Sequence, residues 1–298
     1  MAITKKSGTN PLGEVFGFPI QNIGSSAERY RANTLCPFNN KVPSCTKDSV
    51  SLPLGVCSIN EKDSLAITCP IRFRQDWLII EQSANFLFPA GTSYTSLQEV
   101  RLNDANGGSA GNIDFVILSY DSTGKILDFG SLEVQGVYIS GNVRQPFEYY
   151  MADRVNRTDL QWKATTVRAD YLSSSRKRLV PQMIYKGGIF KAWGKKQAVA
   201  LHETFFNTLP KLTEVDQEKA SVAWLIYGLD YSKETETYNL VHRKTVYTEF
   251  DAALAEITTP NPGPIDSFIE LLQSKLDEKL DINPPNALTL IDILENNR

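Results

Sequence analysis

The sequence has very little histidine and no long apolar run. Its 298 residues include only two histidines, His202 and His242. They lie 40 positions apart, unlike the spacing of a metal site or catalytic triad, so we assign both a structural role. A membrane-spanning helix needs about 20 consecutive apolar residues, and the first 20 residues lack the apolar stretch of a secretory signal. We therefore expect a protein inside a cell, with no membrane as a partner.

The sequence also lacks an overall positive charge, but one long stretch lacks acidic residues. The net charge of −3 excludes a generally basic nucleic-acid-binding protein. Between Tyr171 and His202 no Asp or Glu occurs. Seven Lys and Arg side chains lie in this stretch. They would repel one another unless an anion lies close, and the phosphate backbone of double-stranded DNA supplies that anion at high density. The predicted DNA-binding residues are Arg176, Lys177, Arg178, Gln182, Lys186, Lys191, Lys195 and Lys196. Arg176, Arg178 and Gln182 have the forked groups that read base edges. The alternative is a basic, solvated surface.

Cysteine is absent from most of the chain and concentrated in one segment. The four cysteines are Cys36, Cys45, Cys57 and Cys69, in a loop-rich region with several prolines. In a reducing cytosol, clustered cysteines favour a tetrahedral metal site over disulfides, because thiolates bind zinc or iron tightly. The spacings are wider than those of common zinc modules. The alternative is four cysteines buried as apolar side chains.

The most informative stretch is Asn112 to Tyr138, which reads as two strands joined by a tight turn at residues 121–125. Asp114 interrupts an apolar strand, where a carboxylate needs a cation or hydrogen-bond donors. In a hairpin, Asp114 and Glu133 lie at nearly the same level, close enough to share a divalent metal ion. Gln135 shares the strand face of Glu133, and its amide can orient water or phosphate. An acid followed by an acid-x-polar triplet resembles the PD-(D/E)xK nuclease core.

Glu99 is a further candidate. It belongs to a predicted strand over Leu97 to Leu102, and a glycine-rich link at residues 106–111 leads from there into the hairpin. A sharp reversal at this link would let Glu99 line the same cleft as Asp114. The alternative is a solvated pair of Glu99 with Arg101.

Several motifs together resemble the NotI family of restriction endonucleases. These motifs are CPF at Cys36, Cys45, GVC at Cys57, CP at Cys69, Asp114, and the segment GSLEVQ that ends at Gln135. The Glu-x-Gln of this segment stands where Glu-x-Lys is commonest. The traced resemblance covers roughly residues 10 to 145.

The resemblance implies a Mg²⁺-dependent endonuclease acting on double-stranded DNA. It makes Asp114, Glu133 and Gln135 the catalytic set, with Mg²⁺ held by the two acids. It also implies that the four cysteines hold a structural iron, with zinc as the alternative. For such a type II enzyme we expect a prokaryotic cytoplasmic protein and a cognate DNA methyltransferase that protects host DNA. A palindromic site usually matches a two-fold dimer, so we expect a homodimer.

The expected fold is α/β or α+β, a PD-(D/E)xK core with a mixed central sheet flanked by helices. A hydrophobic content of 42% is enough for a sizeable core. Residues 1–75 would form an N-terminal arm and the four-cysteine segment, residues 76–260 the nuclease core with its DNA-binding stretch, and residues 261–298 a helical tail packed on the core or a dimer partner.

Other elements are read from local patterns. We expect a short helix near Ala27 to Ala32, a chain reversal at Gly187 and Gly188, and an amphipathic helix from Gln197 to Leu209. Two strands beyond Ala220 precede a helix over residues 249–257, a break at residues 258–264 and an amphipathic helix from Ile265 to Leu280. Trp77 to Phe88 mixes helix and strand signals.

Two other functions fit the same residues. One is a non-catalytic DNA-binding protein stabilised by a metal, in which Asp114 is structural. The other is a PD-(D/E)xK nuclease without strict sequence choice, such as a repair or mobile-element enzyme.

Overall fold

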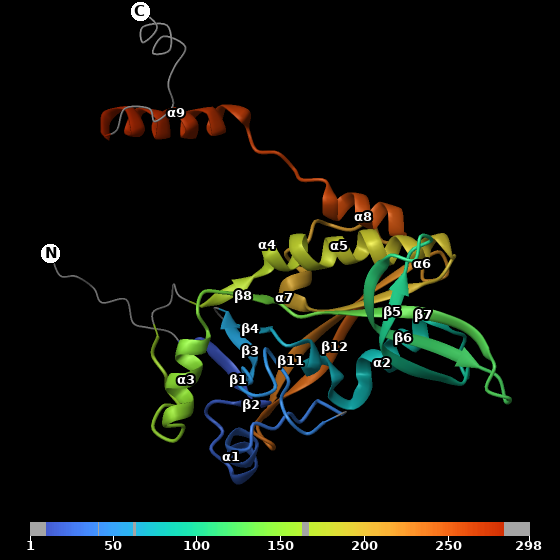
Figure 1. Cartoon of the computed structure of the whole chain (residues 1–298), viewed down its shortest axis with the longest axis horizontal. Helices are drawn as coiled ribbons and strands as arrows, with labels where there is room; N and C mark the ends of the chain where they lie inside the picture. The colour runs from blue at the N-terminus through green and yellow to red at the C-terminus, as the bar shows by residue number, and fades with distance from the viewer. Residues whose placement is uncertain (1–9, 41, 62–63, 163–166, 283–298) are drawn as a thin grey trace, which may run out of the picture. The chain divides into compact units, whose positions relative to one another are not determined.

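The computed structural model describes residues 10–40, 42–61, 64–162 and 167–282 (Figure 1). The chain divides into two compact units, Met1–Thr258 and Thr259–Arg298. None of the helices in the described ranges has the length and apolar character needed to span a bilayer.

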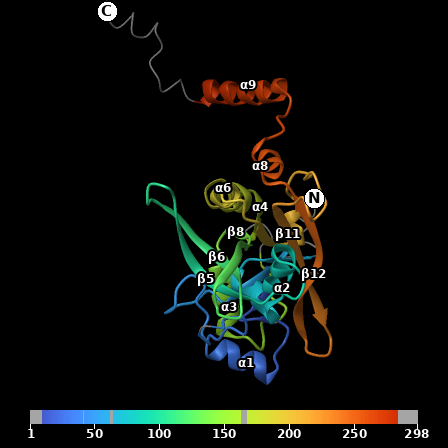
Figure 2. The same ribbon diagram turned by 90° about the vertical axis from the view of Figure 1, so that its right-hand side faces the viewer.

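A six-stranded mixed sheet forms the centre of the larger unit, as expected from the sequence. Its strand order is β12-β11-β10-β7-β6-β5, and β10 runs parallel to both of its neighbours while the other pairs are antiparallel. Figure 2 shows the β5–β6 and β11–β12 hairpins at opposite ends of this sheet. The strands are β5 (Tyr94–Asn103), β6 (Ser109–Tyr120), β7 (Ile126–Gln135), β10 (Gln197–His202), β11 (Val222–Ser232) and β12 (Thr237–Thr248).

Helices cover both faces of the central sheet. On one face, α2 (Leu78–Leu87) packs its apolar side chains against Phe115, Leu132 and Ala200. On the other face, Val199 and Trp224 pack with side chains from a continuous helical segment and from α8 (Phe250–Thr258). That helical segment, residues 171–192, is named here the site helix. It consists of α4 (Tyr171–Ser174), η2 (Ser175–Leu179), α5 (Val180–Gln182), η3 (Met183–Gly187) and α6 (Gly188–Ala192).

A smaller four-stranded sheet carries the cysteine region, with strand order β2-β1-β3-β4. Its strands are β1 (Leu12–Val15), β2 (Phe18–Pro19), β3 (Val56–Glu61) and β4 (Ser64–Ile67). The remaining elements are α1 (Ser25–Ala32), the 3-10 helix η1 (Pro70–Trp77), β8 (Tyr138–Ser140), α3 (Arg144–Ala152), β9 (Arg168–Asp170) and α7 (Glu203–Phe206). The predicted helix near Ala27 to Ala32 is thus confirmed.

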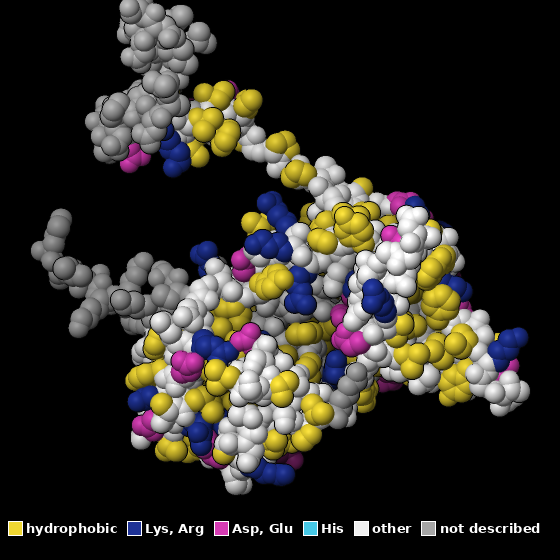
Figure 3. Space-filling model, viewed as in Figure 1, with side chains coloured by type: hydrophobic (Ala, Val, Ile, Leu, Met, Phe, Trp, Pro, Cys, Tyr) yellow, Lys and Arg dark blue, Asp and Glu magenta, His cyan; other side chains and the backbone are white. Residues whose placement is uncertain are grey.

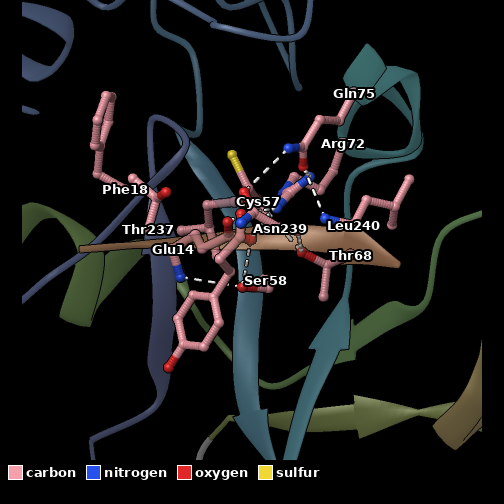
Figure 4. Close-up of polar contacts among 12 residues, drawn as sticks. Glu14, Phe18, Cys57, Ser58, Thr68, Arg72, Gln75, Thr237, Asn239 and Leu240 are labelled. Carbon is pink, nitrogen blue, oxygen red and sulfur yellow. Dashed lines mark hydrogen bonds and ion pairs between the residues drawn. The ribbon is translucent and has the colours of Figure 1, made fainter. Parts of the chain in front are cut away.

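A buried ion pair joins the small sheet to the central one (Figure 4). Arg72 of η1 donates to both carboxylate oxygens of Glu14 at 3.0 Å, and both side chains are fully buried. Ser58 also donates to Glu14, while Arg72 donates to the backbone carbonyl of Tyr238 in β12 at 2.7 Å. Because both charges are paired and hydrogen-bonded, their burial is tolerated and fixes the two sheets together.

The helix predicted from Gln197 to Leu209 is wrong. Residues Gln197–His202 form strand β10, and only Glu203–Phe206 are helical. Every residue of β10 is buried, because the strand lies between β7 and β11 with helices on both faces. A short apolar run of this kind has no alternation, so periodicity alone does not separate strand from helix.

The chain reversal predicted at Gly187 and Gly188 is also wrong, since both glycines lie inside the site helix. A Cβ on Gly187 would lie 2.7 Å from the Phe250 ring and 2.9 Å from Gln197 Oε1. Gly187 therefore permits close packing of the helix on β10 and α8, and it does not form a turn.

The smaller unit contains α9 (Ile265–Ile282), which confirms the predicted C-terminal helix. Its apolar residues Ile265, Phe268, Ile269 and Leu272 are all at least half exposed.

Candidate active site

The hairpin predicted from Asn112 to Tyr138 is confirmed as β6 and β7. Phe115 pairs with Leu132 in an antiparallel register, and continuing this register by one residue sets Asp114 beside Glu133. Asp114 Oδ2 accepts a hydrogen bond from the backbone N–H of Val134 at 2.8 Å. The two carboxylates expected to share a cation are therefore neighbours on adjacent strands.

Glu133 is buried with only 8% of its surface exposed. The pKa of Glu133 is raised to about 8, first by burial and then by the negative charge of Asp114, while Lys186 acts in the opposite direction. Within the described chain, Glu133 Oε1 is buried without a hydrogen-bond partner. Two crowded carboxylates with one unsatisfied oxygen form a set that a divalent cation would stabilise.

Gln135 lies on the same face of β7 as Glu133, as predicted. Both line a small cavity of about 10 Å³ between the sheet and the site helix. Gln135 is 1% exposed, and its amide nitrogen donates to Gln182 Oε1 on the helix. Gln182 therefore contacts a residue of the candidate site, a contact that its predicted role in DNA binding did not include.

Glu99 lies in line with the two acids. Gln98 pairs with Phe115 and Val100 with Ile113, which sets Glu99 opposite Asp114 on the neighbouring strand β5. The Glu99 backbone has a φ of 54°, a left-handed conformation that is uncommon outside glycine. Glu99 and Asp114 line one open cleft of about 410 Å³, together with Arg74. The structure thus brings Glu99 and Asp114 together, as the sequence suggested.

Lys186 is buried in the candidate site, unlike a surface residue that contacts DNA. Its Nζ lies 2.6 Å from Glu133 Oε2 and donates to the backbone carbonyl of Asn112 at 2.8 Å. The side chain is only 8% exposed. Sequence reasoning placed Lys186 among the phosphate-contacting cations, and it missed the contact with Glu133, which lies 53 positions away. The one usable signal is the spacing of Gln182 and Lys186, which puts both on one helical face.

Two more cations of the acid-free stretch have carboxylate partners from distant elements. Lys191 pairs with Asp251, and Lys195 pairs with Asp128 at 2.6 Å. Lys196 lies over the ring of Phe86, with its Nζ 4.7 Å from the ring centroid. The sequence showed no nearby acids because these partners come from β7 and α8.

Arg176 and Lys177 are exposed on the site helix, and Arg178 lies over the ring of Tyr138. No ion pair with a carboxylate involves any of the three within the described ranges. In Figure 3, Lys and Arg side chains gather over the molecule near the start of this helix. Together with Lys196, these three residues are the cations of the predicted DNA-binding set that have no carboxylate partner among the described residues.

The four cysteines line one cavity of about 10 Å³, the volume of a single water-sized atom. Backbone hydrogen bonds hold Cys36 and Cys45 in one loop, with Cys36 N donating to Pro43 O and Cys45 N to Thr34 O. Cys69 N donates to Cys57 O, which joins the other two. All four thiols are free of disulfides.

The pKa of Cys36 is raised to about 11, first by burial and then by the neighbouring Cys69 and Cys45, while backbone N–H groups oppose the shift. Lys47 lines the same cavity, and its positive charge acts against the rise in the pKa of Cys57, which burial causes first. In the part of the chain that the structure describes, no three His, Cys, Asp or Glu side chains are arranged as a metal site. The four cysteines nevertheless line one common cavity, and thiolate sulfur is a donor that zinc and iron bind well.

Comparison with known proteins supplies the family. A search of curated proteins finds no match. The family model described as restriction endonuclease NotI matches residues 14–240, which is more than two thirds of the chain. The match includes all four cysteines, the β6–β7 hairpin and the site helix. The chain belongs to the NotI restriction endonuclease family, and so to the site-specific endonucleases that act on DNA.

Proposed function

We propose that this protein is a Mg²⁺-dependent type II restriction endonuclease that hydrolyses double-stranded DNA at a palindromic site. The observation that carries the proposal is the pairing of Asp114 with Glu133 across β6 and β7, beside an open cleft. Type II restriction endonucleases generally use Mg²⁺. The buried, unpartnered oxygen of Glu133 supports a cation at this position.

Asp114 and Glu133 are the residues that would hold Mg²⁺. When bound, the ion supplies Lewis acidity that lowers the pKa of water and neutralises negative charge on phosphate. Val134 holds the Asp114 carboxylate in place through its backbone N–H. Glu99 lines the same cleft as Asp114 and would place a further carboxylate near a bound phosphate. Gln135 supports the site helix through Gln182 and adds no charge.

DNA would approach along the site helix. Arg176, Lys177 and Arg178 are cationic, lack carboxylate partners among the described residues, and belong to the same helix as Gln182 and Lys186. Cations on such a helix bind phosphate at high density and set the position of the duplex. The same helix therefore links a DNA-contacting surface to the candidate active site.

The four cysteines are proposed to hold a structural metal, iron by family resemblance or zinc as the alternative. Their shared cavity supports one common site. Burial raises the pKa of these thiols, so a bound metal cation would be needed to favour the thiolate form. Such a metal would cross-link the loop of Cys36 and Cys45 to β3, in addition to the apolar packing of Cys45 in the core.

A homodimer would place one active site on each DNA strand. A palindromic site has two-fold symmetry, and a two-fold protein dimer matches it with identical contacts on both halves. A cognate methyltransferase that modifies the same site would protect the host DNA.

The test is cleavage of long unmethylated DNA with Mg²⁺ by purified protein. We expect discrete fragments from the unaltered protein. Asp114→Asn and Glu133→Gln should each slow cleavage by about 100- to 1,000-fold, because each removes charge stabilisation at the reacting phosphate. Asp230→Asn is the matched control, since this acid lies in the same sheet but pairs with Arg243 on the surface.

The fragments also separate the alternatives. A smear would indicate a nuclease without strict sequence choice, and intact DNA bound by the protein would indicate a non-catalytic DNA-binding protein. Full activity in either Asp114→Asn or Glu133→Gln would show that the β6–β7 hairpin is not the active site.

A further inference from the structure

Strand β7 provides no positive charge to the candidate active site. After Glu133, the position where a lysine is commonest in PD-(D/E)xK enzymes holds Gln135, whose amide is turned toward Gln182 of the site helix. A phosphodiester and two carboxylates bring several negative charges together. A reaction site of this kind gains from a fixed cation, which stabilises charge in a water-poor environment.

Lys186 brings a cation to this position from the site helix. Its ammonium group contacts Glu133 Oε2 at 2.6 Å and the carbonyl of Asn112 at 2.8 Å. Asn112 lies two residues before Asp114 on β6, so Lys186 contacts both strands of the hairpin. We propose that Lys186 is a positioning residue of the active site, which supplies from the helix the positive charge that β7 lacks at Gln135.

The contact leaves room for a metal. Lys186 binds Oε2 of Glu133, whereas Oε1 is the buried oxygen without a partner in the described chain. The two oxygens of one carboxylate can therefore serve the lysine and a divalent ion at the same time. In this arrangement Lys186 fixes the orientation of Glu133, as hydrogen-bonded neighbours of metal-binding carboxylates commonly do.

The local helix geometry supports this placement. Lys186 lies in η3 (Met183–Gly187), a π-helical turn, and a second π-helical turn, η2, precedes Pro181. Such widened turns are found frequently at functional sites. Gly187 adds close contact with β10, because any Cβ there would meet Phe250 and Gln197.

The burial of Lys186 sets it apart from its neighbours on the helix. Lys191 forms its ion pair at the surface with its side chain 47% exposed, whereas Lys186 is 8% exposed. A lysine this deep contacts no DNA backbone unless the helix moves. Burying an ammonium is costly without a close partner, and its partners here are the site acid and a site carbonyl.

The inference rests on the proposed nuclease function and is tested by separating turnover from DNA binding. Lys186→Met should lower kcat by about 10- to 100-fold at saturating Mg²⁺, as loss of a residue that orients a metal ligand does. Its Kd for DNA without Mg²⁺ should stay unchanged. Lys186→Arg keeps the charge and should retain more kcat than Lys186→Met.

Lys177→Met is the matched comparison, because Lys177 lies on the same helix but is exposed. It should weaken DNA binding and make that binding less dependent on salt. If Lys186→Met behaves like Lys177→Met, Lys186 is a phosphate contact and the inference is wrong.

Misfolding is controlled in two ways. The kcat is measured per folded molecule, and the double variant Glu133→Gln/Lys186→Met, which removes both buried charges, is measured alongside. The double variant should fold and remain inactive. Normal turnover in folded Lys186→Met, with Glu133→Gln inactive, would overturn only this inference. Normal turnover in Glu133→Gln would overturn the proposed active site itself.

Discussion

His202 shows how a single buried side chain sets the pH dependence of stability. It ends β10, is 1% exposed, and its Nδ1 lies 2.8 Å from Thr204 Oγ1. The pKa of His202 is lowered to about 4, first by burial and then by the positive charges of Arg243 and Arg72. The folded protein therefore holds His202 neutral, whereas the unfolded chain takes up a proton near pH 6.5.

This difference predicts a loss of stability in mild acid. The contribution of His202 to the free energy of unfolding is complete above pH 6.5. It is lost as the pH falls toward about 4, where the loss reaches about 3 kcal/mol. His202→Asn keeps an acceptor for Thr204 and should show a flatter decline of the free energy of unfolding over this range. Urea titrations at several pH values measure the free energy of unfolding of the unaltered protein and the variant, with His242→Asn as the control. Equal slopes in all three proteins would contradict the assignment.

At the same scale, the candidate site was predicted in part. Asp114, Glu133 and Gln135 were identified because they lie in one hairpin, whose register follows from a short turn. The position of Lys186 was not predicted, because its contact with Glu133 depends on how the site helix packs on the sheet. Its charge alone indicated an anion nearby, and that anion is a carboxylate of the protein itself.

At the scale of elements, the cysteine segment depends on a proposed metal. Cys45 packs in the hydrophobic core, and an isolated bridge pairs Leu35 with Ser44, so a metal would add a cross-link to contacts that the loop already makes. We expect about one iron or zinc per chain in the purified protein, detected by elemental analysis with an absorption spectrum. Removal by a strong chelator should lower Tm, and each kcal/mol lost corresponds to about 2–4 °C for a domain of roughly this size.

Adding back single metals distinguishes the proposed cysteine-bound metal from the proposed catalytic Mg²⁺. Adding Mg²⁺ back after chelation should leave Tm low, whereas iron or zinc should restore it. Cys45→Ser should purify with less metal and respond less to the chelator. Metal-free protein with an unchanged Tm and four freely reactive thiols would contradict a structural metal site.

The site helix and β10 show where local sequence patterns mislead at this scale. Lys191 and Lys195 appeared unpaired along the chain, yet they meet Asp251 and Asp128 from other elements. The apolar run at β10 was predicted as helix because nothing local marks a strand with both neighbours parallel. Both errors come from interactions between residues far apart in sequence.

At the scale of the whole molecule, a homodimer predicts how circular DNA is cut. If two active sites act on one palindrome, a plasmid with a single site should pass from the supercoiled to the linear form in one binding event, with little nicked circle. Gel analysis of early time points measures this, and the mass of the protein in solution measures the dimer. Accumulation of nicked circles by a monomer would contradict the proposed assembly.

The sequence by itself determined the features that depend on neighbours in the chain: the β6–β7 hairpin with its paired acids, the cysteine cluster and the C-terminal helix. Only the tertiary structure decided which cations remain free for DNA, that β10 is a strand, and that Lys186 lies against Glu133. The physical reason is that charge pairing and burial join groups far apart in the sequence, such as Lys191 and Asp251, which lie 60 positions apart. Local pattern contains no information about those distances.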